Sequence, residues 1–131
     1  MSIELARCGR TAVLFVMATA HEYGPALRSR IRPLVTGVGP VEAAVETAHA
    51  LAGLEARGDL PDLVVALGSA GSATLAHAEM YQVSRVSYRD IDASPLGIPA
   101  GVTPFLDLPP EVELPLRLPG VPEAKIGRAH V

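Results

Sequence analysis

The sequence predicts an α/β fold in which parallel strands alternate with helices. Residues 63–67 form a short apolar run that ends in the small-residue turn Gly68-Ser69-Ala70-Gly71. Runs of this kind are typical of a central parallel strand that is covered on both faces. The alanine-rich stretch 41–57 has the apolar spacing of a helix, and residues 32–35 predict a strand before it. This order is a βαβ unit, which implies parallel pairing and a right-handed crossover.

The composition is that of one globular domain. The chain has 131 residues, of which 49% are hydrophobic and 19% are charged, and this length is enough for one core. The net charge of −3 argues against nucleic acid and against a membrane surface as the main partner. No apolar run has the length of a membrane span, and we expect no signal peptide. The single cysteine, Cys8, excludes an internal disulfide, and we expect a cytoplasmic protein.

The N-terminal third predicts two strands and a short helix. Residues 1–10 are expected to form a loose lead, and residues 11–18 predict the first buried strand. A Gly-Pro pair at positions 24 and 25 marks the start of a short basic helix over 26–30. The strand over 32–35 then ends in a second glycine turn, residues 36–39.

Proline and glycine residues mark where the remaining predicted elements begin and end. Pro40 suits the first turn of the helix over 41–57, and Gly58 suits its end. Residues 80–87 predict a further strand of a mixed sheet. From 93 to 122 prolines and glycines interrupt every longer element. We expect this stretch to run over the surface, or across a partner chain, without forming a second domain.

The C-terminal residues have a different character. Residues 126–131, Ile-Gly-Arg-Ala-His-Val, read like a translated sequencing adapter. We therefore expect 126–131 to be a non-native tail. Residues 1–125 are interpreted as the N-terminal part of one domain, whose core is incomplete.

Three predicted strands end in residues that suit a binding site. Glu22 follows the first strand, the turn 36–39 follows the second, and Ser69 lies in the turn after the third. In open α/β sheets ligands bind at the carboxyl ends of the strands. Alternatively, Glu22 is an ordinary acidic residue in a loop that is exposed to solvent. Ser69 either presents its hydroxyl and N–H groups to a ligand oxygen or a water, or begins a helix as its N-cap.

The sequence carries no signal for a metal or an organic cofactor. Its four histidines are scattered, without the spacing of metal ligands. There is no P-loop, and Gly37-Val38-Gly39 lacks the downstream pattern of a dinucleotide site.

Four stretches resemble the nucleoside phosphorylase/nucleosidase superfamily, in particular the bacterial 5′-methylthioadenosine/S-adenosylhomocysteine nucleosidases. They occur in the order of the family and are residues 16–22, 36–44, 67–71 and 88–97. The glycine turn, the Gly-Ser-Ala-Gly turn and the Tyr-x-Asp-x-Asp segment together carry the resemblance.

The resemblance implies a fold and a reaction. The fold is a three-layer αβα sandwich around a mixed, largely parallel central sheet, here truncated. The reaction is hydrolysis of the N-glycosidic bond of a purine nucleoside, such as methylthioadenosine or S-adenosylhomocysteine, with water attacking the ribose and adenine leaving. It needs no cofactor. The implied partners are the purine nucleoside, water and, for the full-length protein, a second subunit of a homodimer.

The resemblance also implies a role for individual residues. Glu22 matches the family's acid that binds the ribose and activates water. A carboxylate suits this role because it orients water and stabilises an oxocarbenium-like transition state. Ser69, with Ala70 and Gly71 in the same turn, matches the anion or water pocket. Val38 matches an apolar residue that lines the ribose side, and Gly39 in the same glycine turn is a further substrate-binding candidate. Leu96 falls where the family reaches into the neighbouring subunit's 5′-alkylthio pocket.

The chain departs from the family pattern in two ways. The stretch 23–35 is too short for the family's β-hairpin. The family's general acid, its purine-stacking aromatic residue and its Met-Glu pair have no counterpart here. A general acid commonly contributes about 10²–10⁴-fold, so we expect the chain by itself to be inactive or nearly so.

Two other functions remain open at this point. One is a purine nucleoside phosphorylase, with Arg28, Arg30 and Arg32 as candidates for phosphate binding. The other is a non-catalytic nucleoside-binding or dimerisation module.

Overall fold

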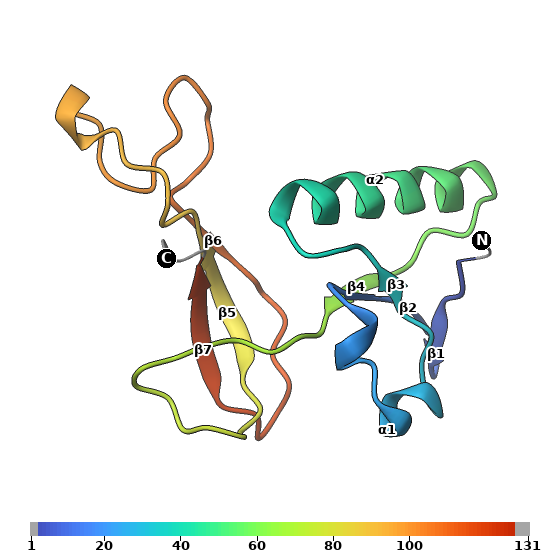
Figure 1. Ribbon diagram of the computed structural model, residues 1–131. Coiled ribbons are helices and arrows are strands. Elements are labelled where there is room, and N and C mark those ends of the chain that lie inside the picture. The colour runs from blue at the N-terminus through green and yellow to red at the C-terminus, as the bar shows by residue number, and fades with distance from the viewer. Residues whose placement is uncertain (1–2, 128–131) are drawn as a thin grey trace. The chain divides into compact units, whose positions relative to one another are not determined.

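The computed structural model describes residues 3–127, and the chain divides into two compact units between Gly71 and Ser72 (Figure 1). The fold is mixed α/β, and each unit holds one sheet that mixes parallel and antiparallel strands. The first unit contains β1 (Ala6–Cys8), β2 (Thr11–Met17), η1 (Ala20–Glu22), α1 (Pro25–Arg28), β3 (Leu34–Val35), α2 (Pro40–Ala56) and β4 (Leu63–Ala66). The second contains β5 (Gln82–Ser87), η2 (Ser94–Leu96), β6 (Glu111–Glu113) and β7 (Glu123–Gly127).

The centre of the first sheet is β2. It pairs in parallel with β3 and with β4, and Val16 faces Leu34 on one side and Ala66 on the other. Val13 likewise lies between Ala6 of β1 and Leu63 of β4. It follows that β4 occupies one edge of β2, while β1 and β3 share the opposite edge.

The prediction that residues 63–67 form the central strand, covered on both faces, is wrong. Among the described residues β4 pairs with β2 alone, and its Val64 side chain is 42% exposed. The strand that is buried on both faces is β2, where Val13, Leu14, Val16 and Met17 are all buried. An apolar run of this length fits an edge strand and a central strand equally well, so the pattern alone did not separate them.

The prediction of a loose N-terminal lead is also wrong for residues 3–10. Ala6–Cys8 forms β1, which turns back antiparallel onto β2 through a tight turn where Gly9 has a positive φ of 64°. Glycine adopts this conformation without the steric cost of a Cβ. Ile3 and Leu5 pack against the hydrophobic core.

The long helix α2 begins and ends close to the predicted positions. Gly39 is its N-cap and Pro40 its first residue. At its end, Gly58 has a φ of 69° and donates to the carbonyl of Glu55, while the Asp59 N–H donates to that of Leu54, both at 2.9 Å. These two bonds form a Schellman motif, which satisfies the last carbonyls of a helix. In Figure 1, α2 runs along one side of the strands of the first unit and α1 lies on the other.

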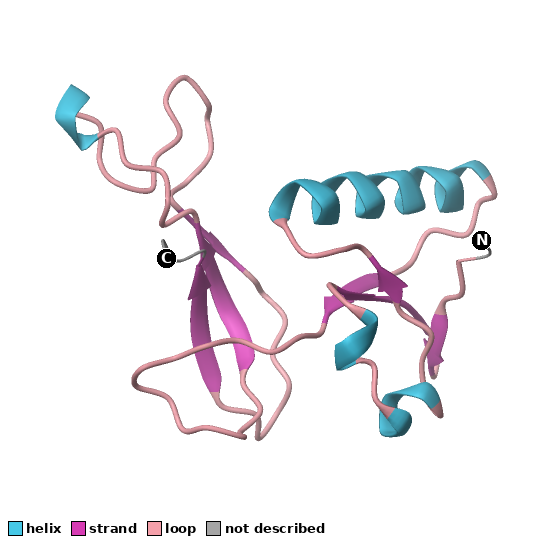
Figure 2. Cartoon of the chain, in the orientation of Figure 1, coloured by secondary structure: helices cyan, strands magenta, loops and turns pink. Residues whose placement is uncertain are grey.

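The second unit is built on the predicted strand near residue 87. β5 pairs antiparallel with β6 and parallel with β7, so it belongs to a different sheet from β2. Between β5 and β6 the chain is loop apart from η2, as the proline-rich sequence predicts (Figure 2). Ile126 and Gly127 of the predicted non-native tail lie in β7, and residues 128–131 lie outside the described residues.

The core of the first unit predicts that Leu54 contributes much more to the stability of the protein than Leu60 does. Leu54 of α2 is fully buried against Leu14 and Val16 of β2, whereas Leu60 is 51% exposed. Leu54→Ala should lower the free energy of unfolding by about 2–5 kcal/mol because it leaves a cavity. Leu60→Ala should change it by less than about 0.5 kcal/mol. Urea unfolding followed by far-UV circular dichroism checks both values, and equal losses would contradict this account of the core.

Candidate functional site

The carboxyl ends of β2, β3 and β4 lie at the same end of the first sheet, because these three strands are parallel. β2 leads into η1, whose last residue is Glu22. β4 leads into the turn that contains Ser69. Since β4 pairs directly with β2, the segments that follow these two strands are brought together.

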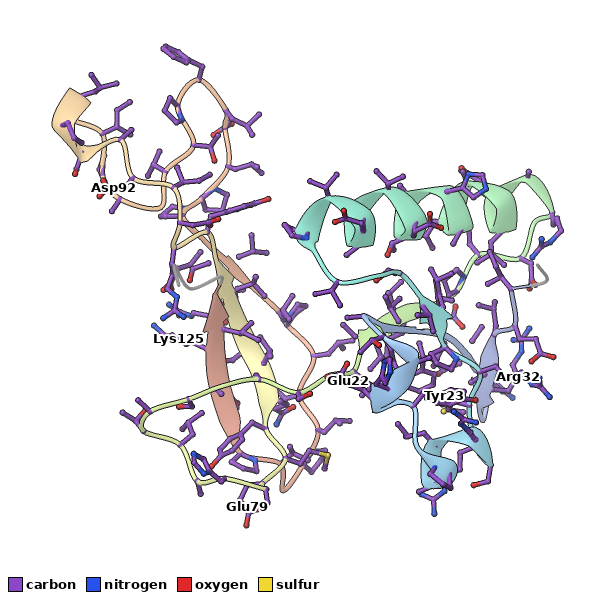
Figure 3. The ribbon with its side chains drawn as sticks, viewed as in Figure 1. Glu22, Tyr23, Arg32, Glu79, Asp92 and Lys125 are labelled. Atoms are coloured by element: carbon purple, nitrogen blue, oxygen red, sulfur yellow. The ribbon has the colours of Figure 1, made fainter. Side chains whose placement is uncertain are left out.

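Glu22 and Ser69 are in direct contact. The Ser69 N–H donates to Oε1 of Glu22 at 2.9 Å, and the Ser69 hydroxyl donates to the same oxygen. Figure 3 shows Glu22 projecting from η1. A Cβ at Gly68 would lie 3.5 Å from Oε2 of Glu22, in ordinary van der Waals contact. The carboxylate therefore packs against the backbone of the turn as well as bonding to it.

These hydrogen bonds favour the ionised form of Glu22. The Ser69 hydroxyl, and second the Ser69 N–H, lower the pKa of Glu22 below its ordinary value of 4.5, and a slight loss of solvation opposes them. Donors that bond to the ionised form stabilise it relative to the neutral form. Both bonds reach Oε1, and within residues 3–127 no hydrogen bond reaches Oε2. Oε2 is thus the oxygen that can accept a further donor.

Thr19 is the N-cap of η1, the short helix that ends at Glu22. This role was not predicted from the sequence. The Thr19 side-chain oxygen caps η1 by accepting the His21 N–H at 3.2 Å. The spacing Thr-x-x-Glu over residues 19–22 is that of a capping box, which is the signal that would have found Thr19. In a capping box the Glu turns back to the N-cap backbone, whereas Glu22 reaches across to Ser69.

Ser69 is not the N-cap of a helix. No helix follows it within residues 70–93, and its hydroxyl is used by Glu22. Glu22 lies in an exposed contact and stays accessible to solvent, but its carboxylate has two donors from one residue 47 positions away in the sequence.

Val38 and Gly39 lie in the turn between β3 and α2, on the opposite edge of β2 from β4. The Val38 side chain is 80% exposed. Gly39 has a φ of 143° and a ψ of 152°, and a Cβ there would collide with the carboxylate of Glu42. Glu42 is in the first turn of α2, where a negative charge is stabilised by the helix dipole.

Ala70 and Gly71 do not take part in the contact between Glu22 and Ser69. Ala70 and Gly71 follow Ser69 and are exposed. Leu96 is in η2 of the second unit and is 79% exposed. The structure therefore brings Glu22 and Ser69 together. Val38 and Gly39 lie after β3, the strand that pairs with β2 on its other edge.

Two of the three candidate phosphate-binding arginines are already engaged. Arg28 donates through Nε to the Tyr23 carbonyl at 2.8 Å and lies over the Tyr23 ring. Arg32 pairs through Nε with Glu4 at 2.8 Å.

Neither a metal site nor a membrane-spanning helix is found in the part of the chain that the structure describes. Nowhere in residues 3–127 do three His, Cys, Asp or Glu side chains gather in an arrangement suited to a metal ion. In the same residues no helix combines the length and apolar character needed to cross a membrane. No protein-family model and no curated protein matches the sequence.

The contact with Ser69 predicts an acidic titration of Glu22. Its carboxyl carbon, followed by NMR as the pH falls, should titrate below 4.5. In Ser69→Ala the midpoint should rise toward 4.5, because the hydroxyl donor is lost while the N–H remains. Any stability that the contact provides is present above the unfolded pKa and is lost as the pH falls through the folded one. Ser29→Ala, whose hydroxyl bonds to the Ala26 carbonyl, is the control. An unchanged midpoint in Ser69→Ala would refute the contact.

Substitution by alanine should change the stability of the protein in opposite directions at Gly39, the N-cap of α2, and at Gly53, inside α2. Gly39→Ala should destabilise the protein by about 1–3 kcal/mol, because its φ and ψ belong to a region that only glycine adopts readily. Gly53, inside α2, has open space where a Cβ would lie, so Gly53→Ala should stabilise the protein by about 0.5–1 kcal/mol. Thermal unfolding of the two variants measures the difference, and a neutral Gly39→Ala would contradict the turn geometry.

Proposed function

We propose that this chain is the N-terminal part of an N-glycosyl hydrolase that acts on purine nucleosides, with Glu22 as its catalytic carboxylate. The observation that carries the proposal is the Glu22 carboxylate held by both donors of Ser69 beside the carboxyl ends of parallel strands. Two residues that resemble the family's site, 47 positions apart, meet in this contact. The substrates proposed are nucleosides such as methylthioadenosine and S-adenosylhomocysteine.

The lowered pKa of Glu22 suggests how it would contribute. The carboxylate is ionised at neutral pH, so its charge can stabilise the positive charge that develops on the ribose as the glycosidic bond breaks. A carboxylate with a low pKa is a weak base, because general bases work best with a pKa near the operating pH. We therefore assign Glu22 mainly to electrostatic stabilisation, and to accepting hydrogen bonds from water or a ribose hydroxyl through Oε2.

The same contact favours water over phosphate as the nucleophile. The hydroxyl and N–H of Ser69, which would otherwise suit an anion, already bond to a carboxylate. A phosphate dianion arriving there would meet a like charge, whereas a neutral water would not. We infer hydrolysis in preference to phosphorolysis.

We assign the remaining catalytic residues to a longer protein. In it the general acid and the purine-binding residues come from outside this chain. The completed domain is a three-layer αβα sandwich that works as a cytoplasmic homodimer. On this proposal the 131 residues alone release adenine very slowly or not at all, since a general acid is commonly worth about 10²–10⁴-fold.

The test reads the source DNA past the codon for Lys125 and compares this chain with the longer product that it encodes; a stop codon directly after Lys125 or Val131 would refute the proposal. Both are incubated with methylthioadenosine without phosphate, and adenine release is followed by chromatography. The longer product should release adenine, and Glu22→Gln should lower its kcat by about 10²–10³-fold, because one electrostatic stabiliser of the transition state is lost. Glu46→Gln, on the exposed side of α2, is the matched control and should retain full activity.

Each other outcome selects a different function. Release of ribose 1-phosphate that requires phosphate would replace the hydrolase with a phosphorylase. Binding of adenosine analogues that is lost in Glu22→Gln, with no turnover by the longer product, would favour the nucleoside-binding module. Absence of both binding and turnover would refute the proposal.

A further inference from the structure

Tyr23, the residue directly after Glu22, is held by three separate interactions. Its hydroxyl donates to the carbonyl of Ile31. Its own carbonyl accepts a hydrogen bond from Nε of Arg28 at 2.8 Å. The Arg28 guanidinium also lies over the Tyr23 ring, with 5.3 Å between Cζ and the ring centroid. The hydroxyl, the ring and the backbone of this half-buried residue are therefore all fixed.

The bond from the Tyr23 hydroxyl closes a loop between η1 and the chain that enters β3. Tyr23 is the C-cap of η1, and Ile31 lies shortly before β3. Between them, the Leu27 N–H donates to the Gly24 carbonyl at 3.1 Å, and the Ile31 N–H donates to the Leu27 carbonyl at 2.9 Å. The end of η1 is thus tied, through α1, to a segment whose strand pairs with β2. Figure 3 shows Glu22 and Tyr23 in this part of the first unit.

The opposite end of η1 is fixed as well. Thr19 is its N-cap, and the Glu22 N–H donates to the Thr19 carbonyl at 3.3 Å. A single turn of 3₁₀-helix has few hydrogen bonds, and their geometry is poor, so it has little stability of its own. The position of Glu22 therefore depends on the residues that hold the two ends of this turn, which are Thr19 and Tyr23.

We propose that Tyr23 is a positioning residue for Glu22. Its anchor to Ile31 holds η1 where the Glu22 carboxylate reaches both donors of Ser69. This contact joins the segments that follow two different strands, β2 and β4, so it forms fully only when the backbone of each segment is fixed. The part that Tyr23 plays in catalysis rests on the proposed function, whereas its effect on the contact with Ser69 does not.

The experiment introduces Tyr23→Phe into the 131-residue chain and follows the Glu22 carboxyl carbon by NMR as the pH falls. The substitution removes the hydroxyl that bonds to Ile31 and keeps the ring beneath Arg28. The titration midpoint should rise toward 4.5, because a less firmly placed carboxylate loses part of the hydrogen bonding that favours its ionised form. Backbone amide spectra of the same samples show whether each variant is folded.

Tyr81→Phe is the matched control. It is the same chemical change in the second unit, where the Tyr81 hydroxyl accepts the Ala76 N–H at 3.1 Å. It should leave the Glu22 midpoint unchanged. Arg28→Gln removes the partner of the Tyr23 carbonyl and ring. This variant should also raise the midpoint, and it takes the place of Tyr23→Phe if that variant does not fold.

A double variant shows whether Tyr23 acts through the contact with Ser69. Ser69→Ala already lacks the donor that has the larger effect on the pKa of Glu22. Tyr23→Phe should therefore raise the midpoint less in the Ser69→Ala background than in the wild-type chain, since residues that act through one contact are not additive.

In the longer protein, Tyr23→Phe should lower kcat for adenine release about tenfold with little change in KM, because the transition state loses a correctly placed charge. An unchanged kcat would overturn the role in catalysis. A midpoint that stays unchanged in folded Tyr23→Phe, that rises equally in Tyr81→Phe, or that rises by the same amount without the Ser69 hydroxyl would overturn the proposal as a whole. If the longer protein has no turnover, the proposed function fails, and the titration alone decides the role of Tyr23.

Discussion

The parallel pairing of β2 with β4 is the constraint on which the first unit depends. Its register is fixed at the start by Asp62, whose N–H donates to the Ala12 carbonyl at 2.8 Å while its carboxylate accepts the Ala12 N–H at 2.7 Å. At the other end, the Leu67 N–H donates to the Val16 carbonyl. A slip of one residue would turn every side chain of β4 to the other face. It would also move Ser69 along the sheet and away from Glu22.

Burial and function are divided between different strands of this sheet. β2 carries the core, since its side chains are buried on both faces and meet Leu54 of α2 on one of them. β3 and β4 are short and partly exposed, and they carry the glycine turns. Turns of this kind are suited to binding because a rigid strand positions them while their backbone N–H groups remain accessible.

The two charged features of the first unit have opposite character. At the strand ends, an ionised carboxylate occupies the donors of Ser69, which favours neutral or cationic groups there. Beside the β1 and β3 edge, Arg28, Arg30 and Arg32 outnumber the single acid Glu4, so this part of the surface is basic. The separation follows from the topology, because β1 joins the edge of β2 that β4 does not occupy. Each feature can therefore be altered by substitution without touching the other.

The sequence by itself determined the local elements of this protein. The apolar runs, the alanine-rich helix and the Gly and Pro residues that end them are local signals, and β2, α1, α2, β4 and β5 formed where these signals predicted. It also singled out Glu22 and Ser69, each at the end of a predicted strand. The tertiary structure alone decided which strand is central, that β1 closes a hairpin on β2, and that β5 belongs to a second sheet. The physical reason is that strand partners are chosen by long-range hydrogen bonds and shared burial, which leave no mark on the periodicity of a single strand. For the same reason only the fold could show that Ser69 bonds to Glu22 rather than capping a helix.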